Sequence, residues 1–355
     1  MRAPYSRERH VAELAVLRAS ILTKRVQSTV SEISKDDNSP VTVADFAAQA
    51  LIISALRDAF PDDGFLGEED AAALRRDGAL AEQVYGLVSS APEVAEYSNF
   101  EAPNTLAKPI SVEDMLNCID LGGRGTGGDK GRFWIMDPVD GTAAFVKGQQ
   151  YGVALALIED GREVVGVLGC PNVGANTTRI SEDDVDRDGL GVMLTAVRGR
   201  GSTIRTMSLR GLGAALALSH LESSPNPEDL HIVDCVASTD SRHDVVAKLA
   251  HDFQTTLPVI DLWSLHIRYA ALVVGGADVH FCIPTTPNPS RMHIWDHAGS
   301  QLIFTELGGK VTDLDGKLVD FGAGRDLNRN RGLVVAREGI HETLLAAVNK
   351  ILLEA

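Results

Sequence analysis

The stretch from Phe133 to Thr142, Phe-Trp-Ile-Met-Asp-Pro-Val-Asp-Gly-Thr, constrains the fold more than any other part of the chain. Its first four residues are an uncharged run that is typical of a buried strand. Pro138 and Gly141 are expected to end this strand in a tight turn. Asp137 and Asp140 would then lie together at a strand end. Two carboxylates this close repel each other unless a cation lies between them, and a hard divalent cation prefers such oxygen ligands.

The same motif also has an ordinary structural interpretation. Asp, Pro and Gly are common turn residues, and an Asp-rich turn often caps a helix. Taken alone, the motif is equally compatible with a helix cap and with a metal site. Thr142, which follows the glycine, would present a hydroxyl group to the same point. Other carboxylates in the chain must therefore decide between the two interpretations.

Length and charge limit the class of protein. A chain of 355 residues is too long for one ordinary core, and we expect two packed subdomains, residues 1–172 and 173–355. The composition, 44% hydrophobic and 23% charged, is that of a globular protein. The formal net charge of -16 argues against a nucleic-acid polymer or an anionic membrane as partner.

Cysteine spacing and apolar runs indicate the compartment. The four cysteines are scattered without a CxxC spacing, which argues against a zinc site and favours reduced thiols. The charged N-terminus lacks the apolar core of a signal peptide, and no apolar run has the length of a membrane span. We therefore expect a cytoplasmic protein.

Two acidic positions in the first half coincide with predicted element ends. Apolar residues at helical spacing predict helices over 7–30 and from Thr42 to Phe60. Thr42 and Asp45 have the spacing of a capping box, and capping alone would explain Asp45. Further on, Gly67 separates a short apolar element from Glu68-Glu69-Asp70. Such acidic runs are usually solvated, but Gly67 would let the backbone turn so that Glu68 points into a site.

The rest of the chain predicts a mixed α/β protein, because strands and helices alternate in its second half. An Asp-Gly turn at 160–161 predicts a hairpin. The glycine-rich segment 121–131 lacks the order of a P-loop and is interpreted as a flexible connection. Asp296 lies at the start of a helix expected over 294–307. The expected strands are 133–136, 152–158, 164–169, 192–197, 231–236, 257–260, 278–283, a pair within 310–319, and 332–336, and the remaining helices are 80–88, 112–119, 244–253, 264–274 and 338–353.

The order of the acidic residues resembles a known family. A helix-start Asp, Gly-Glu-Glu, Asp-Pro-x-Asp-Gly-Thr and a late Trp-Asp are similar to the motifs of the lithium-sensitive, metal-dependent phosphatases of the inositol monophosphatase superfamily. Within it, the chain most resembles the fungal and plant 3'(2'),5'-bisphosphate nucleotidases. The residues that carry the resemblance are Ser39-Pro40-Val41-Thr42 with Asp45, Phe60-Pro61-Asp62-Asp63 with Gly67-Glu68-Glu69, Gly131-Arg132-Phe133-Trp134 with Asp137 to Thr142, Gly169-Cys170-Pro171-Asn172, Ala196-Val197-Arg198-Gly199 and Ile294-Trp295-Asp296-His297-Ala298.

The resemblance implies a fold and a metal site. The fold would be a five-layer αβαβα sandwich, with most metal ligands in residues 1–172. Glu68, Asp137 and the Val139 carbonyl would hold one Mg²⁺. Asp137, Asp140 and Asp296 would hold a second.

The resemblance also assigns roles around the metal ions. Asp45 and Thr142 would orient and deprotonate the attacking water. A third, weaker metal ion near Asp45 and Glu68 is compatible with the pattern. Backbone N–H groups from Gly141 onward would bind phosphate oxygens.

On the substrate side the sequence departs from the family pattern. A Gly-His-Ser-Ser-His-like turn is replaced by 238–243, and in the Ser-x-x-Lys-Tyr motif Leu265 replaces the serine and Arg268 the lysine. Cys282 stands where an arginine is expected, which removes a bidentate phosphate clamp. Arg242, His243 and Arg291 could compensate.

We therefore expect a Mg²⁺-dependent phosphatase that converts 3'-phosphoadenosine 5'-phosphate to AMP and phosphate, as a monomer or homodimer. One alternative is a relative that hydrolyses an inositol phosphate or another phosphorylated metabolite. A second is a non-catalytic protein that binds a phosphorylated ligand. Asp45 and Thr142 argue against the second alternative, because a binding protein needs no water-activating pair.

Overall fold

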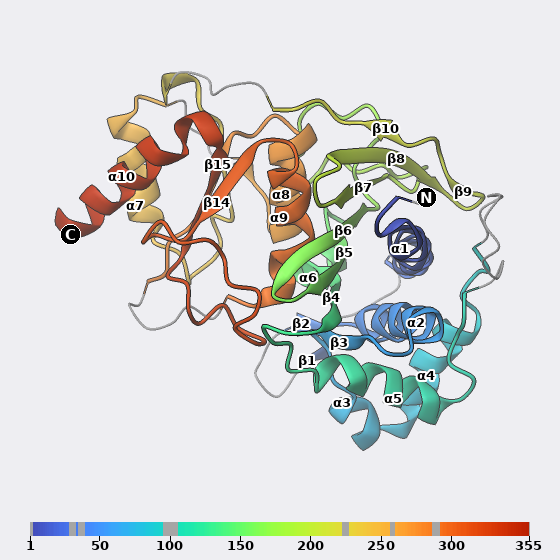
Figure 1. Cartoon of the computed structure of the whole chain (residues 1–355). Helices are drawn as coiled ribbons and strands as arrows, with labels where there is room; N and C mark the ends of the chain where they lie inside the picture. The colour runs from blue at the N-terminus through green and yellow to red at the C-terminus, as the bar shows by residue number, and fades with distance from the viewer. Residues whose placement is uncertain are drawn as a thin grey trace.

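The computed structural model describes most of the chain (Figure 1). The described residues are 3–27, 33–34, 40–94, 106–221, 227–255, 260–285 and 292–354, with only the backbone described at 33–34, 40 and 227. Arg291 lies outside them. No helix in these ranges is long and apolar enough to cross a membrane.

A large, mostly antiparallel sheet forms the centre of the molecule. Its strand order is β10-β8-β7-β6-β5-β4-β3, with β9 paired to β8. Among the described strands of this sheet, only β3 runs parallel to its neighbour, β4. The strands are β3 (Gly64–Gly67), β4 (Arg132–Asp140), β5 (Gly152–Glu159), β6 (Arg162–Cys170), β7 (Val192–Val197), β8 (Ser202–Ser208), β9 (Gly211–Leu212) and β10 (Leu216–Ala217).

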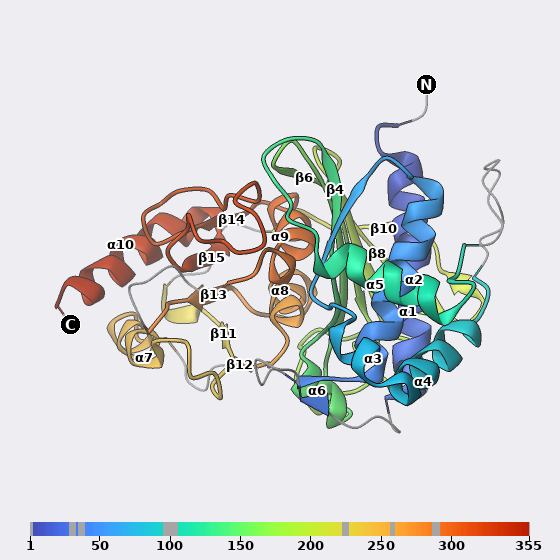
Figure 2. The ribbon, with the colours of Figure 1, turned by 90° about the horizontal axis from the view of Figure 1, so that it is seen from below.

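One face of this sheet is covered by the N-terminal helices, and Figure 2 shows them as a layer beside it. Both α1 (Ser6–Val26) and α2 (Val43–Ala59) bury long runs of Ala, Leu, Ile and Val, which form one core with β4 to β6. The smaller elements of this half are β1 (Ile33–Ser34), β2 (Pro40–Val41), α3 (Ala72–Arg76), α4 (Gly78–Ser89), α5 (Val112–Gly123) and α6 (Thr142–Val146).

The opposite face packs on α8 (Leu265–Val274) and α9 (Ala298–Thr305), which separate the large sheet from a second, smaller one (Figure 2). The order of that sheet is β12-β11-β13-β15-β14. Its outer face is covered by α7 (His243–Asp252) and α10 (Glu338–Glu354). The remaining elements are η1 (Pro227–Asp229), β11 (Ile232–Asp234), β12 (Ile260–Asp261), β13 (Val279–Cys282), η2 (Ile294–Asp296), β14 (Gly309–Thr312) and β15 (Leu333–Arg337).

The layers therefore alternate helix, sheet, helix, sheet, helix, which confirms the expected α/β sandwich. The larger sheet contains strands from both predicted subdomains, 1–172 and 173–355, because β7, β8 and β10 come after residue 172.

Three predicted elements differ from the structure. The central strand continues through Pro138 to Asp140, because the pairing with β5 shifts register between Asp137 and Asp140 and the missing N–H of proline costs no ladder bond. The helix expected over 294–307 is a 3₁₀ turn, η2, followed by α9.

The third difference is the strand pair expected within 310–319. Strand β14 ends at Thr312 and pairs with β15 instead of folding back on the next segment. The Asp313 carboxylate accepts the backbone N–H groups of Asp315 and Lys317, at 2.9 Å each, and so holds this segment as a turn.

Candidate active site

The parallel pairing of β3 and β4 brings the first acidic residues together. Gly67, the last residue of β3, pairs with Met136, so Glu68 and Asp137 are the next residues along two neighbouring parallel strands. Asp140 follows after the register shift at the end of β4. The local pattern of the sequence thus places three of the predicted ligands at one point.

Asp137 lies at the centre of this group. Its side chain is buried, and burial is the main cause that raises its pKa well above the usual range. The charges of Glu68, Asp140, Asp296 and Asp45 each raise the pKa further. The other four predicted acidic residues are therefore within electrostatic reach of the buried Asp137 carboxylate.

Asp296 reaches the group from the second half of the chain, on the short turn η2. Burial and the charges of Asp140 and Glu68 raise its pKa well above the usual range, while the Arg268 guanidinium lowers it. Asp296 therefore shares the electrostatic environment of Asp140 and Glu68.

Asp45 both caps α2 and faces the site. Its Oδ2 accepts the Thr42 N–H at 2.9 Å and the Thr42 hydroxyl at 2.6 Å, which completes the predicted capping box. Its Oδ1 lies 3.4 Å from the Thr142 hydroxyl, which is also 3.1 Å from the Val139 carbonyl oxygen. Asp45 therefore caps the helix and also lies beside Thr142, so the structural and the functional interpretation do not exclude each other.

Gly141 forms the corner between β4 and α6. Its φ of +87° is a left-handed conformation that favours glycine, and a Cβ atom here would lie 2.8 Å from the Cβ of Ser264. Ser264 donates its hydroxyl to Asp140 Oδ2, and the backbone N–H of His266 donates to the same oxygen at 2.6 Å. The start of α8 thus fixes the orientation of Asp140.

The residues that position the acids have no recognisable motif in the sequence. The Gln49 side chain accepts the Glu69 N–H at 3.0 Å and donates to the Glu69 carbonyl at 2.6 Å, so it holds the turn that carries Glu68. Arg325 donates to the Gly67 carbonyl at 2.8 Å from the C-terminal half. Ser264 was interpreted only as a helix start. Gln49 and Arg325 contact backbone groups and Ser264 contacts a side chain, all of them far away in sequence, and the chain carries no local pattern for such contacts.

The donor set has the chemistry of a metal site. Buried carboxylates that raise one another's pKa require positive charge, and a hard divalent cation with oxygen ligands supplies it. As the side chains stand, no three Asp, Glu, His or Cys residues of the described ranges enclose a single ion. Asp140 Oδ2 is directed at Ser264 and His266, and metal binding would require the carboxylates to draw together.

The residues predicted to bind substrate differ in the contacts that their side chains already make. Arg268 donates to the Trp263 carbonyl at 3.2 Å and lies 3.3 Å from His280, while its Nε is buried without a partner. Its charge acts on Asp296, so it borders the site. Cys282 lies 3.1 Å from His280, and burial raises the pKa of its thiol to about 12, which makes it neutral.

Arg242 and His243 are engaged elsewhere. Arg242 makes two bonds of 2.7 Å to Asp244 in its own helix. His243 contacts the Asp234 carboxylate at 2.9 Å and the Ser238 carbonyl at 2.7 Å. Both would have to give up these contacts to bind a phosphate.

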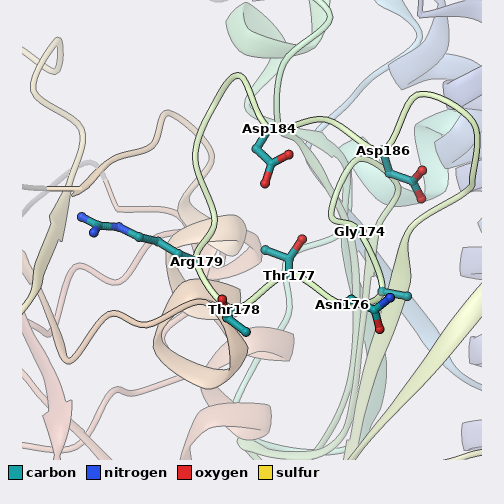
Figure 3. Close-up of a pocket in the computed structure, with 8 residues that line it drawn as sticks. Gly174, Asn176, Thr177, Thr178, Arg179, Asp184 and Asp186 are labelled. Atoms are coloured by element: carbon teal, nitrogen blue, oxygen red, sulfur yellow. The ribbon is translucent and has the colours of Figure 1, made fainter.

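A cavity of about 720 Å³ lies in the loop after β6. Figure 3 shows Thr177 and Asp184 beside it, with Arg179 extending away from them. None of the predicted metal or catalytic residues lines it, so it does not define the site. Its lining residues are Gly174, Ala175, Asn176, Thr177, Thr178, Arg179, Asp184 and Asp186.

Comparison with known proteins gives consistent relatives. The model of the inositol monophosphatase family matches residues 7–353. The 3'(2'),5'-bisphosphate nucleotidase of Emericella nidulans is 39% identical over 357 residues, which cover 98% of this chain and 99% of the relative. The 3',5'-bisphosphate nucleotidase 2 of Arabidopsis thaliana is 33% identical over 354 residues, with 98% and 97% covered.

A solved structure supports the fold. Inositol monophosphatase II of Staphylococcus aureus, determined with 2'AMP bound, aligns with a TM-score of 0.56 at 17% identity, covering 95% of this chain and 91% of that one. The family match over nearly the whole length and the two relatives above 30% identity show that the chain belongs to the inositol monophosphatase family.

Proposed function

We propose that this chain is a Mg²⁺-dependent phosphatase that removes the 3'-phosphate from 3'-phosphoadenosine 5'-phosphate, giving AMP and phosphate. The observation that carries the proposal is the acidic group around buried Asp137, with the Asp45–Thr142 pair beside it. Relatives at 31–39% identity over nearly the whole chain bear the name 3'(2'),5'-bisphosphate nucleotidase or 3',5'-bisphosphate nucleotidase, which supports the nucleotide substrate.

The metal ligands in this proposal are Glu68, Asp137, Asp140, Asp296 and the Val139 carbonyl. They would hold two Mg²⁺ ions, and a third would lie near Asp45 and Glu68. When bound, the metal ions act as Lewis acids that stabilise the charge on the transferring phosphoryl group.

Asp45 and Thr142 act on the attacking water. The Thr142 hydroxyl donates to Asp45 Oδ1, so its lone pair can accept a hydrogen from water and relay the proton to the carboxylate. The Thr42 bonds hold Asp45 Oδ2 in place during this step. The water oxygen then bonds to phosphorus while the bond between phosphorus and the 3'-oxygen breaks, and the 3'-oxygen takes a proton from solvent to become the 3'-hydroxyl of AMP. Backbone N–H groups after Gly141 bind the phosphate oxygens.

Phosphate release from a panel of substrates tests the proposal. With Mg²⁺, the chain should hydrolyse 3'-phosphoadenosine 5'-phosphate, and removal of the metal with EDTA should abolish the activity. Turnover of inositol phosphate alone would contradict the nucleotide substrate and favour the alternative that Cys282 and the engaged Arg242 suggest. No turnover on any substrate would favour a non-catalytic binding protein.

A further inference from the structure

A half-exposed tryptophan adjoins the acidic group. Trp263 directly precedes Ser264, which donates its hydroxyl to Asp140. The other two tryptophans, Trp134 and Trp295, are buried. Trp263 therefore offers aromatic surface to a ligand within one residue of the proposed chemistry.

A lysine lies over this indole. The Nζ of Lys147 is 4.3 Å from the centre of the Trp263 ring, a cation–π contact. Lys147 is exposed and ends the short helix α6, whose first residue is Thr142. Within the described ranges its ammonium group makes no hydrogen bond or ion pair, so its charge is available to an anion.

The position of Trp263 is fixed by its backbone and not by its side chain. Its N–H donates to Glu182 at 2.6 Å, and its carbonyl accepts a bond from Arg268 at 3.2 Å. Glu182 also accepts the Gln150 N–H at 3.0 Å, which ties this segment to the start of β5. Removal of the indole would leave all of these contacts in place.

The substrate has two features that the acidic group cannot recognise. A bisphosphate nucleotide carries an aromatic base and a second phosphate that is not hydrolysed. Cys282 is neutral, and the Arg268 guanidinium already contacts Trp263 and His280, so additional positive charge is needed for that phosphate. The Trp263–Lys147 pair combines an aromatic ring with an ammonium group that forms no ion pair within the described ranges.

We propose that Trp263 and Lys147 form the nucleotide-recognition subsite, in which the indole stacks on the purine and the ammonium group binds the second phosphate. This inference rests on the proposed nucleotide phosphatase function. Base–aromatic stacking is tolerant of base identity, so the subsite selects for a nucleotide and not for adenine in particular.

Steady-state kinetics with product inhibition test the subsite. Trp263→Ala should raise the KM for 3'-phosphoadenosine 5'-phosphate and the inhibition constant of AMP about tenfold, while kcat and inhibition by inorganic phosphate stay nearly unchanged. Trp263→Phe, which keeps an aromatic face, should retain most of the affinity. Lys147→Met should also raise the KM, whereas Lys130→Met, at the opposite end of β4, should not.

A failure of the subsite proposal can be distinguished from a failure of the proposed function. If the wild type hydrolyses the nucleotide but Trp263→Ala leaves the KM and AMP inhibition unchanged, the subsite is wrong and the proposed function stands. If the wild type releases no phosphate from the nucleotide, the proposed function fails, and calorimetric titration with AMP decides on the subsite. Weaker AMP binding by Trp263→Ala would then support it, and equal or absent binding would overturn it.

Discussion

At the scale of single residues, the two carboxylate oxygens of Asp45 have different hydrogen-bond partners. One oxygen accepts both Thr42 bonds and the other faces Thr142, so the carboxylate is held rigidly while one acceptor remains directed at the site. A base fixed in this way loses little conformational freedom when it takes a proton.

Thr142→Ala removes the hydroxyl that, in the proposed mechanism, links Asp45 to the attacking water. The kcat for 3'-phosphoadenosine 5'-phosphate should fall roughly a hundredfold or more, because general base catalysis is lost. The KM should change little, since the backbone N–H groups that bind phosphate remain. Steady-state kinetics check this, and a variant that is impaired only in substrate binding would show that Thr142 has a different role.

At the scale of secondary structure elements, the start of α2 links stability to activity. Thr42 accepts the Ala44 N–H at 3.1 Å and donates to Asp45. Asp77 caps α4 in a similar way, through the N–H groups of Ala79 and Leu80, but within the described part of the chain it makes no contact with the acidic group. The caps at Thr42 and Asp77 can therefore be compared directly by mutation.

Thr42→Ala and Asp77→Ala should each lower the free energy of unfolding by about 1 kcal/mol, because each loses a helix cap. Only Thr42→Ala should also reduce kcat, since it releases Asp45. Chemical denaturation and steady-state kinetics measure the two effects. Equal activity of both variants would mean that the cap does not orient the catalytic carboxylate.

Glu163, which connects β6 with α9, provides a test of pH dependence. It accepts a bond of 2.7 Å from Arg198 and one of 3.1 Å from Gln301, and burial raises its pKa. A carboxyl group whose pKa is raised in the folded state binds more protons in the folded than in the unfolded protein. Its contribution to stability therefore falls as pH rises from the pKa of the unfolded state, about 4.3, to the pKa of the folded state.

Thermal unfolding of the wild type and Glu163→Gln across pH checks this sign. The stability of the wild type relative to the variant should be greatest at low pH and should decline through that window. A difference that grows with pH would mean that the pairing with Arg198 outweighs burial.

The elements that could be predicted are those with strong local patterns. The capping box at Thr42 and the Asp160-Gly161 hairpin turn follow directly from residue type and spacing. Strand β8 (Ser202–Ser208) was missed, because its residues Ser-Thr-Ile-Arg-Thr-Met-Ser alternate only weakly in polarity. The turn after β14 was predicted as a strand pair. It depends on hydrogen bonds that the Asp313 carboxylate accepts from backbone N–H groups, and residue type and spacing do not reveal these bonds.

At the scale of the whole molecule, the site is assembled from both halves of the chain. Glu68, Asp137 and Asp140 come from the ends of β3 and β4 in the large sheet, whereas Asp296 comes from η2, a turn of the second half of the chain that packs against β4 and β5. The acids themselves could be named from the order of motifs in the sequence. Their supports, Gln49 and Ser264, could not, because such contacts arise only when distant segments pack.

Arg325 is the clearest link between the halves. It donates to the carbonyl groups of Gly67, Gly122 and Gly125 at 2.8 to 3.2 Å, and its guanidinium lies 4.6 Å from the ring centre of Trp295, next to Asp296. It therefore fixes the strand end before Glu68 relative to the turn that carries Asp296.

Arg325→Ala should lower the free energy of unfolding by roughly 2 kcal/mol, because hydrogen bonds from a charged donor are lost. It should also raise the Mg²⁺ concentration needed for half-maximal activity, and Arg325→Lys should restore part of both effects. The control is Arg329→Ala, which removes only an exposed ion pair with Asp320. A loss of stability without any change in Mg²⁺ dependence would limit Arg325 to a structural role.

The most direct test of the central claim, that these carboxylates form a catalytic metal site, is the Mg²⁺ dependence of phosphate release from 3'-phosphoadenosine 5'-phosphate by the wild type and Asp140→Asn. The wild type should show saturable Mg²⁺ activation. Asp140→Asn should need about tenfold more Mg²⁺ or lose turnover altogether, because a metal ligand has lost its charge. An unchanged Mg²⁺ dependence with full activity would remove Asp140 from the site and contradict the account.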